Sequence, residues 1–168
     1  GFDGVLVENF GDAPFAPGEV GPVTVAALCR CALGVRQAAP ELGLGVNVLR
    51  NDAHAALAIA AACEAQLIRV NVHVGARLTD QGLIEGRAHD TLRLRRALGR
   101  HEGPGRIALL CDVAVKHSAS IAPRTLAEEA EETALRGLAD ALVVTGRSTG
   151  RGADLRDVEE VLVAAPLP

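Results

Sequence analysis

The 168-residue sequence predicts an α/β fold in which strands and helices alternate along the chain. Short, continuous apolar runs recur from end to end, as they do in parallel strands that are buried on both faces. Longer segments with apolar residues at helical spacing lie between these runs. The composition, 49% hydrophobic and 23% charged, is that of a globular protein. Alternating strands and helices build either an open doubly wound sheet or a (β/α)8 barrel.

The apolar runs predict five strands, at residues 4–7, 44–49, 67–71, 107–111 and 141–144. The segments between them predict the helices. The first helix carries an apolar stripe of Val25, Leu28, Ala32 and Val35. The second follows Asp52, a favourable N-cap, and buries Ala53, Ala56, Leu57 and Ala60. A third helix, with a less regular pattern, is expected near residues 87–98.

The last two helices have clear start signals. Thr125 and Glu128 form a capping box that opens a helix, and Gly137 is placed to end it. We expect the inner face of this helix to comprise Leu126, Ala130, Thr133 and Ala134. Asp154 opens the final helix, whose apolar face comprises Leu155, Val158 and Leu162.

The sequence favours the barrel over the open sheet. No G-x-G-x-x-G turn follows a strand, so a dinucleotide-binding fold is not indicated. A complete (β/α)8, or TIM, barrel needs about 250 residues. We therefore expect residues 1–168 to form a single partial barrel domain of about five βα units, truncated at both ends.

Composition excludes several classes of function. A net charge of −4, three aromatic residues and no Lys/Arg cluster argue against nucleic-acid binding. No apolar stretch reaches the roughly 18–20 residues that span a bilayer, so no transmembrane segment is expected. Four cysteines without C-x-x-C spacing, and no signal peptide, predict a cytoplasmic protein with free thiols.

Polar residues follow each predicted strand, at the end where barrel enzymes carry their active sites. They are Glu8, Asn9 and Asp12; Asn47, Arg50, Asn51 and Asp52; Asn71 and His73; Asp112, Lys116 and His117; and Thr145, Ser148 and Thr149. Carboxamide side chains inside apolar strands are costly to bury unless they are hydrogen-bonded. Their presence in these strands therefore indicates a site. The alternative is that strand ends are polar simply because they face solvent.

Residues 72–86 are long for a βα loop, which usually has about 2–6 residues. Such loops are often lids or binding loops, and this one contains Asp80, Gln81 and Glu85 with Gly75, Gly82 and Gly86 as pivots. An ordered surface loop is the alternative.

Several blocks strongly resemble the BtpA family: VENFGDAPF at 7–15, GVNVLRND at 45–52, RVNVH at 69–73, TDQG and IEG within 79–86, DV and VKH within 112–117, and GLADA at 137–141. The resemblance covers essentially the whole chain. It implies a (β/α)8 barrel akin to the ribulose-phosphate-binding group, of which this chain would supply strands two to six. The family takes its name from a photosystem I biogenesis protein, and related proteins occur in sugar-utilisation contexts.

Proton transfer is the chemistry that best fits the candidate residues. Lys116, the single lysine, lies close to Asp112 in the sequence, and His73 or His117 would be the second acid–base group. Schiff-base formation, a salt bridge or a phosphate contact are alternatives for Lys116. The predicted catalytic residues are Lys116, Asp112, His73, His117 and Glu8. The predicted substrate-binding residues are Asn9, Asn47, Asn71, Arg50, Asp80, Thr145 and Gly146.

Cofactor and anion sites are less clearly indicated. His73, Asp112 and His117 are of metal-ligand type, but no H-x-H or H-x-x-x-H spacing supports them, so no cofactor is predicted and a divalent metal is the alternative. The loop at residues 145–152, with Arg147 and Arg151, is a candidate anion site because it precedes a helix N-terminus.

The favoured function is an enzyme, of isomerase or lyase type, that acts on a small anionic, sugar-phosphate-like metabolite. One alternative is a non-catalytic photosystem I biogenesis or stability factor that associates peripherally with membranes; an oligomer is compatible with either function. Another is a phosphoribosylanthranilate-isomerase-like activity, which needs a catalytic Cys and Asp at the ends of the first and sixth strands. The strand counted as sixth here ends instead at Thr145 and Gly146.

Overall fold

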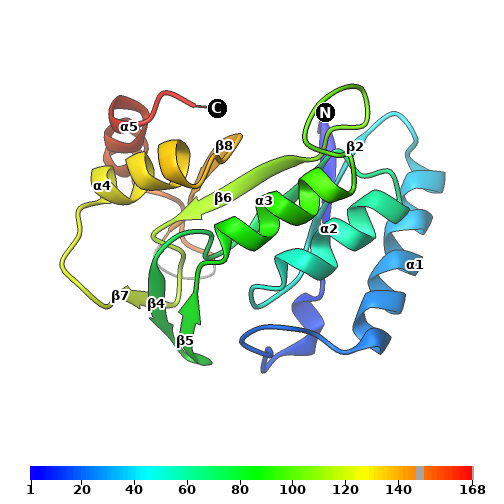
Figure 1. The fold of residues 1–168 in the computed structure, drawn as a ribbon, viewed down its shortest axis with the longest axis horizontal. Coiled ribbons are helices and arrows are strands. Elements are labelled where there is room, and N and C mark those ends of the chain that lie inside the picture. The colour runs from blue at the N-terminus through cyan, green and yellow to red at the C-terminus, as the bar shows by residue number, and fades with distance from the viewer. Residues whose placement is uncertain (147–149, 168) are drawn as a thin grey trace. The chain divides into compact units, whose positions relative to one another are not determined.

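The computed structural model describes residues 1–146 and 150–167 (Figure 1). Arg147, Ser148 and Thr149 of the predicted anion loop lie outside the described residues. The chain divides into two compact units. The first comprises Gly1–Val70 and His89–Leu109, and the second comprises Asn71–Ala88 and Leu110–Pro168.

The first unit contains three parallel strands and the helices that follow them. Its elements are β1 (Gly4–Glu8), the short 3-10 turn Phe10–Asp12, α1 (Pro22–Ala38), β2 (Gly43–Asn47), α2 (Ala53–Ala62), β3 (Leu67–Val70) and α3 (Ala88–Ala97). The register of β1 on β2 runs from Gly4↔Gly43 to Glu8↔Asn47. Glu8 and Asn47 are therefore neighbours at the carboxyl ends of the two strands.

The second unit contains the elements β4 (Ala76–Thr79), β5 (Gly82–Glu85), β6 (Ala108–Val113), β7 (Ser118–Ser120), α4 (Leu126–Glu131), a π-helical turn (Glu132–Arg136), β8 (Ala141–Val144) and α5 (Leu155–Ala164). β6 pairs in parallel with β8, from Leu110↔Ala141 to Val113↔Val144. The strands of the first unit pair in parallel in the order β1-β2-β3. The predicted α/β fold and the five predicted strands are thus confirmed, and closure into a TIM barrel stays a prediction.

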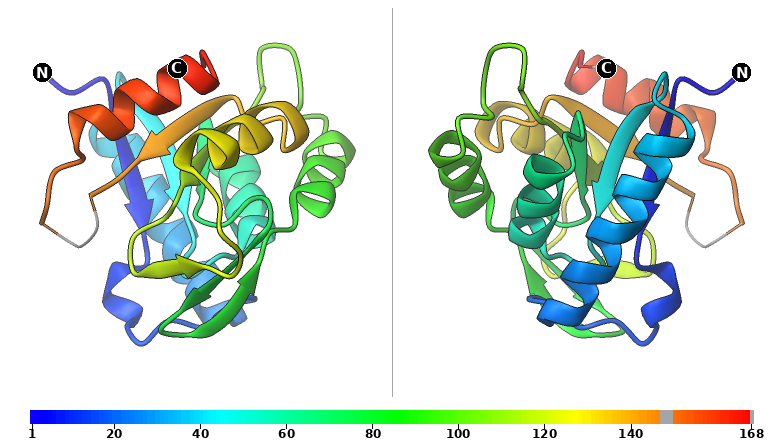
Figure 2. Two further views of the ribbon diagram at one scale, coloured as in Figure 1. Left: turned by 90° about the vertical axis from the view of Figure 1, so that its left-hand side faces the viewer. Right: turned by 90° about the vertical axis from the view of Figure 1, so that its right-hand side faces the viewer.

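The long segment predicted as a loop is instead a β-hairpin. β4 pairs antiparallel with β5, from Ala76↔Glu85 to Thr79↔Gly82, across the two-residue turn Asp80–Gln81. Gly82 has φ +96°, a conformation that L side chains rarely adopt, and the Thr79 hydroxyl donates to its carbonyl at 2.9 Å. β7 pairs with the other edge of β4, which gives a small sheet in the order β5-β4-β7 (Figure 2).

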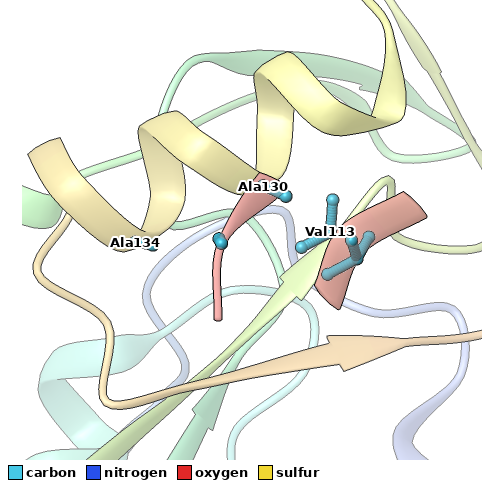
Figure 3. Close-up of a cluster of buried hydrophobic side chains, with 5 residues drawn as sticks. Val113, Ala130 and Ala134 are labelled. Atoms are coloured by element: carbon cyan, nitrogen blue, oxygen red, sulfur yellow. The ribbon is translucent and has the colours of Figure 1, made fainter. Parts of the chain in front are cut away.

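The core of the second unit is built from small and branched side chains. Val113 on β6 packs with Ala130 on α4 and with Ala134 in the π-helical turn (Figure 3). Val161 and Ala165 near the end of α5 complete the cluster. The predicted capping box is confirmed, because Thr125 accepts from the Glu128 amide while the Glu128 carboxylate accepts from the Thr125 amide. The π-helical turn continues this helix to Gly137, where the predicted helix was expected to end.

Asp52 fixes the start of α2 through two backbone hydrogen bonds. Its Oδ1 accepts from the amide of Ala55 and its Oδ2 accepts from the amide of Val20, each at 2.9 Å. The side chain therefore caps a helix and also holds the segment that leads into α1. Only 8% of the residue is exposed, so solvent cannot easily replace either bond.

We expect Asp52→Ala to lower the free energy of unfolding by about 1–2 kcal/mol, the usual cost of losing an N-cap. Asp52→Asn should cost less, because the amide oxygen still accepts one of the two bonds. Urea denaturation of the intact protein measures both variants. Equal stability of wild type and Asp52→Ala would contradict this role.

Candidate functional site

The centre of the candidate site is a buried pair of side chains in the second unit. Asn71 directly follows β3 in the chain, and Asp112 lies near the end of β6. The Asn71 Nδ2 donates to Asp112 Oδ2 at 3.0 Å, and both residues are buried. The two residues come from strand ends that the sequence analysis singled out, and the hydrogen bond fixes the orientation of the carboxylate.

This pair lines a cavity of about 30 Å³ within the second unit. Four of the polar residues in its wall are more than nine-tenths buried: Asn71, His73, Asp112 and Thr133. More exposed polar residues complete the wall, namely Arg77, Ser120, Arg124 and Glu129. Such a concentration of buried polar groups is unusual in a protein core and is typical of binding and catalytic sites.

His73 is held rigidly in this wall. Its Nε2 donates to the carbonyl of Gly137 at 2.8 Å, which makes Nδ1 the acceptor nitrogen in the neutral ring. A Cβ at Gly137 would lie 2.9 Å from the ring, so glycine is required for this close approach. The backbone of His73 also accepts from the amide of Ala88 at 3.0 Å.

Glu129 joins three segments of the second unit. Its carboxylate accepts two hydrogen bonds from Arg77 Nη1 at 2.7 and 2.8 Å and one from the amide of Ala114 at 3.2 Å. Arg77 also donates from Nε to Ser118 at 2.7 Å. We call this set of contacts among Arg77, Ala114, Ser118 and Glu129 the Glu129 brace.

The loop after β6 depends on this brace. Ala114 and His117 have φ of +49° and +57°, a left-handed conformation that is unfavourable for residues other than glycine. The brace holds the loop at both ends, at the Ala114 amide and at Ser118. Lys116 is half-buried and His117 is exposed, and neither is among the described residues that line the cavity.

Arg124 forms a second ion pair beside the cavity. Its Nη2 donates to Glu132 Oε1 at 2.6 Å, and this contact lowers the pKa of Glu132 and raises that of Arg124. Because the pKa of Glu132 is lowered, the pair stabilises the fold above the ordinary carboxyl pKa, and this contribution is lost as the pH falls through the lowered value. Both side chains are about one-third exposed, so solvent weakens the pair.

The predicted site residues of the first unit form their own cluster. Asn47 Nδ2 donates to Glu8 Oε2 at 3.2 Å. Asn9 uses both ends of its amide within the protein: Oδ1 accepts from the amide of Leu49 at 2.7 Å, and Nδ2 donates to the Leu49 carbonyl at 3.1 Å. Arg50 is buried, and its amide donates to the Ala16 carbonyl. Asn9 thus has a structural task in joining the ends of β1 and β2.

The other predicted site residues of the second unit lie apart from the cavity wall in the described chain. Asp80 is exposed in the hairpin turn, where Gln81 donates to its carboxylate. Thr145 and Gly146 are half-buried and directly follow β8. A Cβ at Gly146 would meet the carbonyl oxygens of Arg151 and Gly152, so the backbone folds closely on itself here.

Sequence reasoning did not find Arg77, Ser120, Arg124, Glu129 or Thr133 as site residues. Arg77 lies in a hairpin that was expected to be a loop. Glu129 follows the capping box by one residue and resembles an ordinary surface glutamate. A signal for Arg77 was the alternation of polar and apolar residues over 77–79.

A larger cavity, of about 260 Å³, lies in the first unit. It is lined by Glu64, Gln66, Arg100, Arg106 and neighbouring residues at the amino ends of β3 and β6. Active sites of parallel α/β folds lie at the carboxyl ends of the strands. The smaller cavity is therefore the better candidate, because its buried polar groups follow that rule.

Three observations on the described residues concern metal-ligand groups, membrane-spanning helices and a buried thiol. Within residues 1–146 and 150–167, no group of three or more His, Cys, Asp or Glu side chains is placed to share a metal ion. None of the helices described there combines the length and the apolar character needed to cross a bilayer. Burial, together with the neighbouring Cys29 thiol, raises the pKa of Cys63 to about 11, so this thiol is protonated at neutral pH.

Comparison with known proteins identifies the family. A family model described as the BtpA family matches residues 1–168. The chain belongs to the BtpA family. It is 45% identical over 167 residues to the Photosystem I biogenesis protein BtpA of Synechocystis. The aligned region covers 98% of this chain and 55% of that protein.

Similar proteins occur far from photosynthetic organisms. An uncharacterized protein of Thermococcus kodakarensis is 45% identical over 168 residues, which is 100% of this chain and 61% of that protein. An uncharacterized mitochondrial protein of Caenorhabditis elegans is 31% identical over 173 residues, again 100% of this chain and 61% of that protein. The chain thus spans little more than half the length of these relatives. No solved structure matches the chain.

We expect Glu129→Gln to lower the free energy of unfolding by up to about 3 kcal/mol, because it leaves the Arg77 guanidinium without its charge partner. The two side chains are 13% and 15% exposed, so solvent replaces little of the loss. Chemical denaturation measures the change. Glu131→Gln, an exposed position on the same helix, is the matched control and should stay within about 0.5 kcal/mol of wild type. A similar loss in both variants would contradict the brace.

Proposed function

We propose that this BtpA-family chain carries the acid–base site of an enzyme that acts on a small anionic, sugar-phosphate-like metabolite. The observation that supports the proposal is the buried Asn71–Asp112 hydrogen bond in the wall of a cavity that Arg77 and Arg124 also line. A carboxylate supplies the base, and guanidinium groups are the usual partners of phosphate and carboxylate ligands.

Asp112 is the proposed proton acceptor. Asn71 donates to one of its oxygens, which holds the carboxylate in one orientation. Burial keeps water away from the carboxylate and so strengthens its interaction with a bound substrate. Proton removal and return by such a group serves isomerisation, and proton removal followed by bond cleavage serves lyase chemistry.

The arginines are proposed to bind the anionic group of the substrate. Arg77 uses Nη1 and Nε in the Glu129 brace, which leaves the N–H groups of Nη2 outside those contacts. Arg124 lies at the exposed end of the cavity wall and contacts Glu132 through Nη2. A phosphate group would compete with Glu132 for a guanidinium that is only partly engaged.

The second acid–base group is proposed to be Lys116, His73 or His117. Lys116 and His117 lie in the braced loop four and five residues after Asp112, and this closeness in the chain supports a place for them at the same site. His73 already lies in the cavity wall. Glu8 and Asn47 are proposed as site residues of the first unit in their own right, and the enzyme is proposed to be cytoplasmic.

A second candidate function is supported by the name of one relative, the Photosystem I biogenesis protein BtpA. In that case the chain would be a non-catalytic assembly factor. The exposed apolar side chains of the small sheet, Leu78 and Leu83, with nearby Ile121, are the surface that favours protein contact.

Thermal-shift screening of the intact protein with inorganic phosphate and phosphorylated sugars tests the proposed enzymatic function. We expect Arg124→Gln to weaken binding of any ligand found by about tenfold or more, the typical contribution of a charge-assisted hydrogen bond. Asp112→Asn should bind the ligand but turn it over about 10²–10⁴-fold more slowly.

Two further variants complete this test. Arg96→Gln, an exposed arginine on α3, is the control for Arg124 and should leave binding unchanged. Lys116→Arg keeps the charge but cannot lose its proton, so lost turnover with retained binding assigns Lys116 a chemical role. Unchanged turnover in Asp112→Asn would contradict the proposed base.

A further inference from the structure

The carbonyl oxygen of Asn71 has no hydrogen-bond partner among the described residues, although the residue is only 3% exposed. The orientation of the Asn71 amide group follows from the chemistry of its hydrogen-bond partner. An ionised carboxylate accepts hydrogen bonds and cannot donate, so the amide nitrogen of Asn71 must face Asp112 and the oxygen must face elsewhere. A buried acceptor without a donor is unfavourable, and native proteins rarely retain one without a reason.

The cavity beside Asn71 can accommodate a donor. Its 30 Å³ are sufficient for one or two water-sized groups and insufficient for a phosphate. The buried groups of its wall are mainly acceptors: the Asn71 carbonyl, the Asp112 carboxylate, and Thr133, whose hydroxyl already donates to the carbonyl of Glu129 at 2.7 Å. A wall of this kind selects a group that donates a hydrogen bond over a carbonyl or ether oxygen.

The charges around the cavity favour a neutral donor. Asp112 is negative, but Arg77 and Arg124 also line the wall, and the carboxylate of Glu129 is already engaged by Arg77. An ammonium group would therefore meet two guanidinium groups as well as the carboxylate. A hydroxyl group satisfies the Asn71 carbonyl without adding charge.

We propose that this cavity is a subsite for one hydroxyl group of the ligand, with the Asn71 carbonyl as its acceptor beside Asp112. The inference rests on the proposed function and narrows it, because the ligand then carries a hydroxyl group for the cavity in addition to an anionic group for the arginines. The class of ligand is a phosphorylated polyol.

Isothermal titration of the intact protein with two matched compounds tests the subsite. Glycerol 3-phosphate and propyl phosphate have the same chain length and the same anionic group, but propyl phosphate has no hydroxyl groups. We expect glycerol 3-phosphate to bind at least about tenfold more tightly, because a site built to accept a hydroxyl hydrogen discriminates against a ligand that lacks one.

Asn71→Leu removes the acceptor at similar volume, and we expect it to reduce the preference to less than about twofold. Gln37→Leu, which removes an exposed amide from α1, is the matched control and should keep the full preference. If Asn71→Leu fails to fold, a crystal structure of the wild-type protein with glycerol 3-phosphate shows whether a ligand hydroxyl reaches Asn71. A ligand hydroxyl within hydrogen-bond distance of Asn71 Oδ1 supports the subsite, and a water there with the ligand elsewhere overturns it.

The possible failures of the inference and of the proposed function are distinguishable. Equal affinity for the two compounds overturns the hydroxyl subsite and leaves an anion-binding enzyme. A preference that persists in Asn71→Leu overturns the assignment to Asn71. Absence of binding by both compounds and by inorganic phosphate contradicts the anionic substrate, and the subsite with it.

Discussion

The carboxylate of Glu129 is the interaction on which the second unit depends. It binds Arg77 from the hairpin and the Ala114 amide from the loop after β6, and it lies on the helix that packs against Val113. These contacts hold two residues of that loop in a left-handed conformation. The position of the cavity wall, including Asp112 two residues before Ala114, therefore follows from one partly buried ion pair that is supported by a backbone hydrogen bond.

The strands and helices were predictable because each depends on local pattern. The apolar runs, the Asp52 cap and the Thr125 capping box act within a few residues, and the structure confirms them. The expectation that site residues lie at the carboxyl ends of the strands also singled out Asn71 and Asp112, which are hydrogen-bonded in the structure. The contact between Arg77 and Glu129 was not predictable, because it is set by tertiary packing across 52 residues of chain. The hairpin at residues 76–85 was missed because its strands have only four residues each.

Family membership and site geometry provide different kinds of information about function. The BtpA family model covers residues 1–168, and a relative is named for photosystem I biogenesis. Similar proteins are found in Thermococcus kodakarensis and in Caenorhabditis elegans, and the proposed cavity chemistry does not require a photosystem. A buried carboxylate oriented by an amide, with two arginines nearby, is unnecessary in a passive assembly surface and is typical of a binding or catalytic site.

Hydrogen–deuterium exchange of the intact protein, with and without a ligand found by screening, tests most directly whether this cavity is the functional site. The account predicts that the ligand slows exchange in residues 71–77 and 112–124, which line the cavity and form the braced loop. Segments 60–66 and 100–106, around the larger cavity of the first unit, should be unaffected. Protection confined to those two segments, with none at 71–77 or 112–124, would contradict the account.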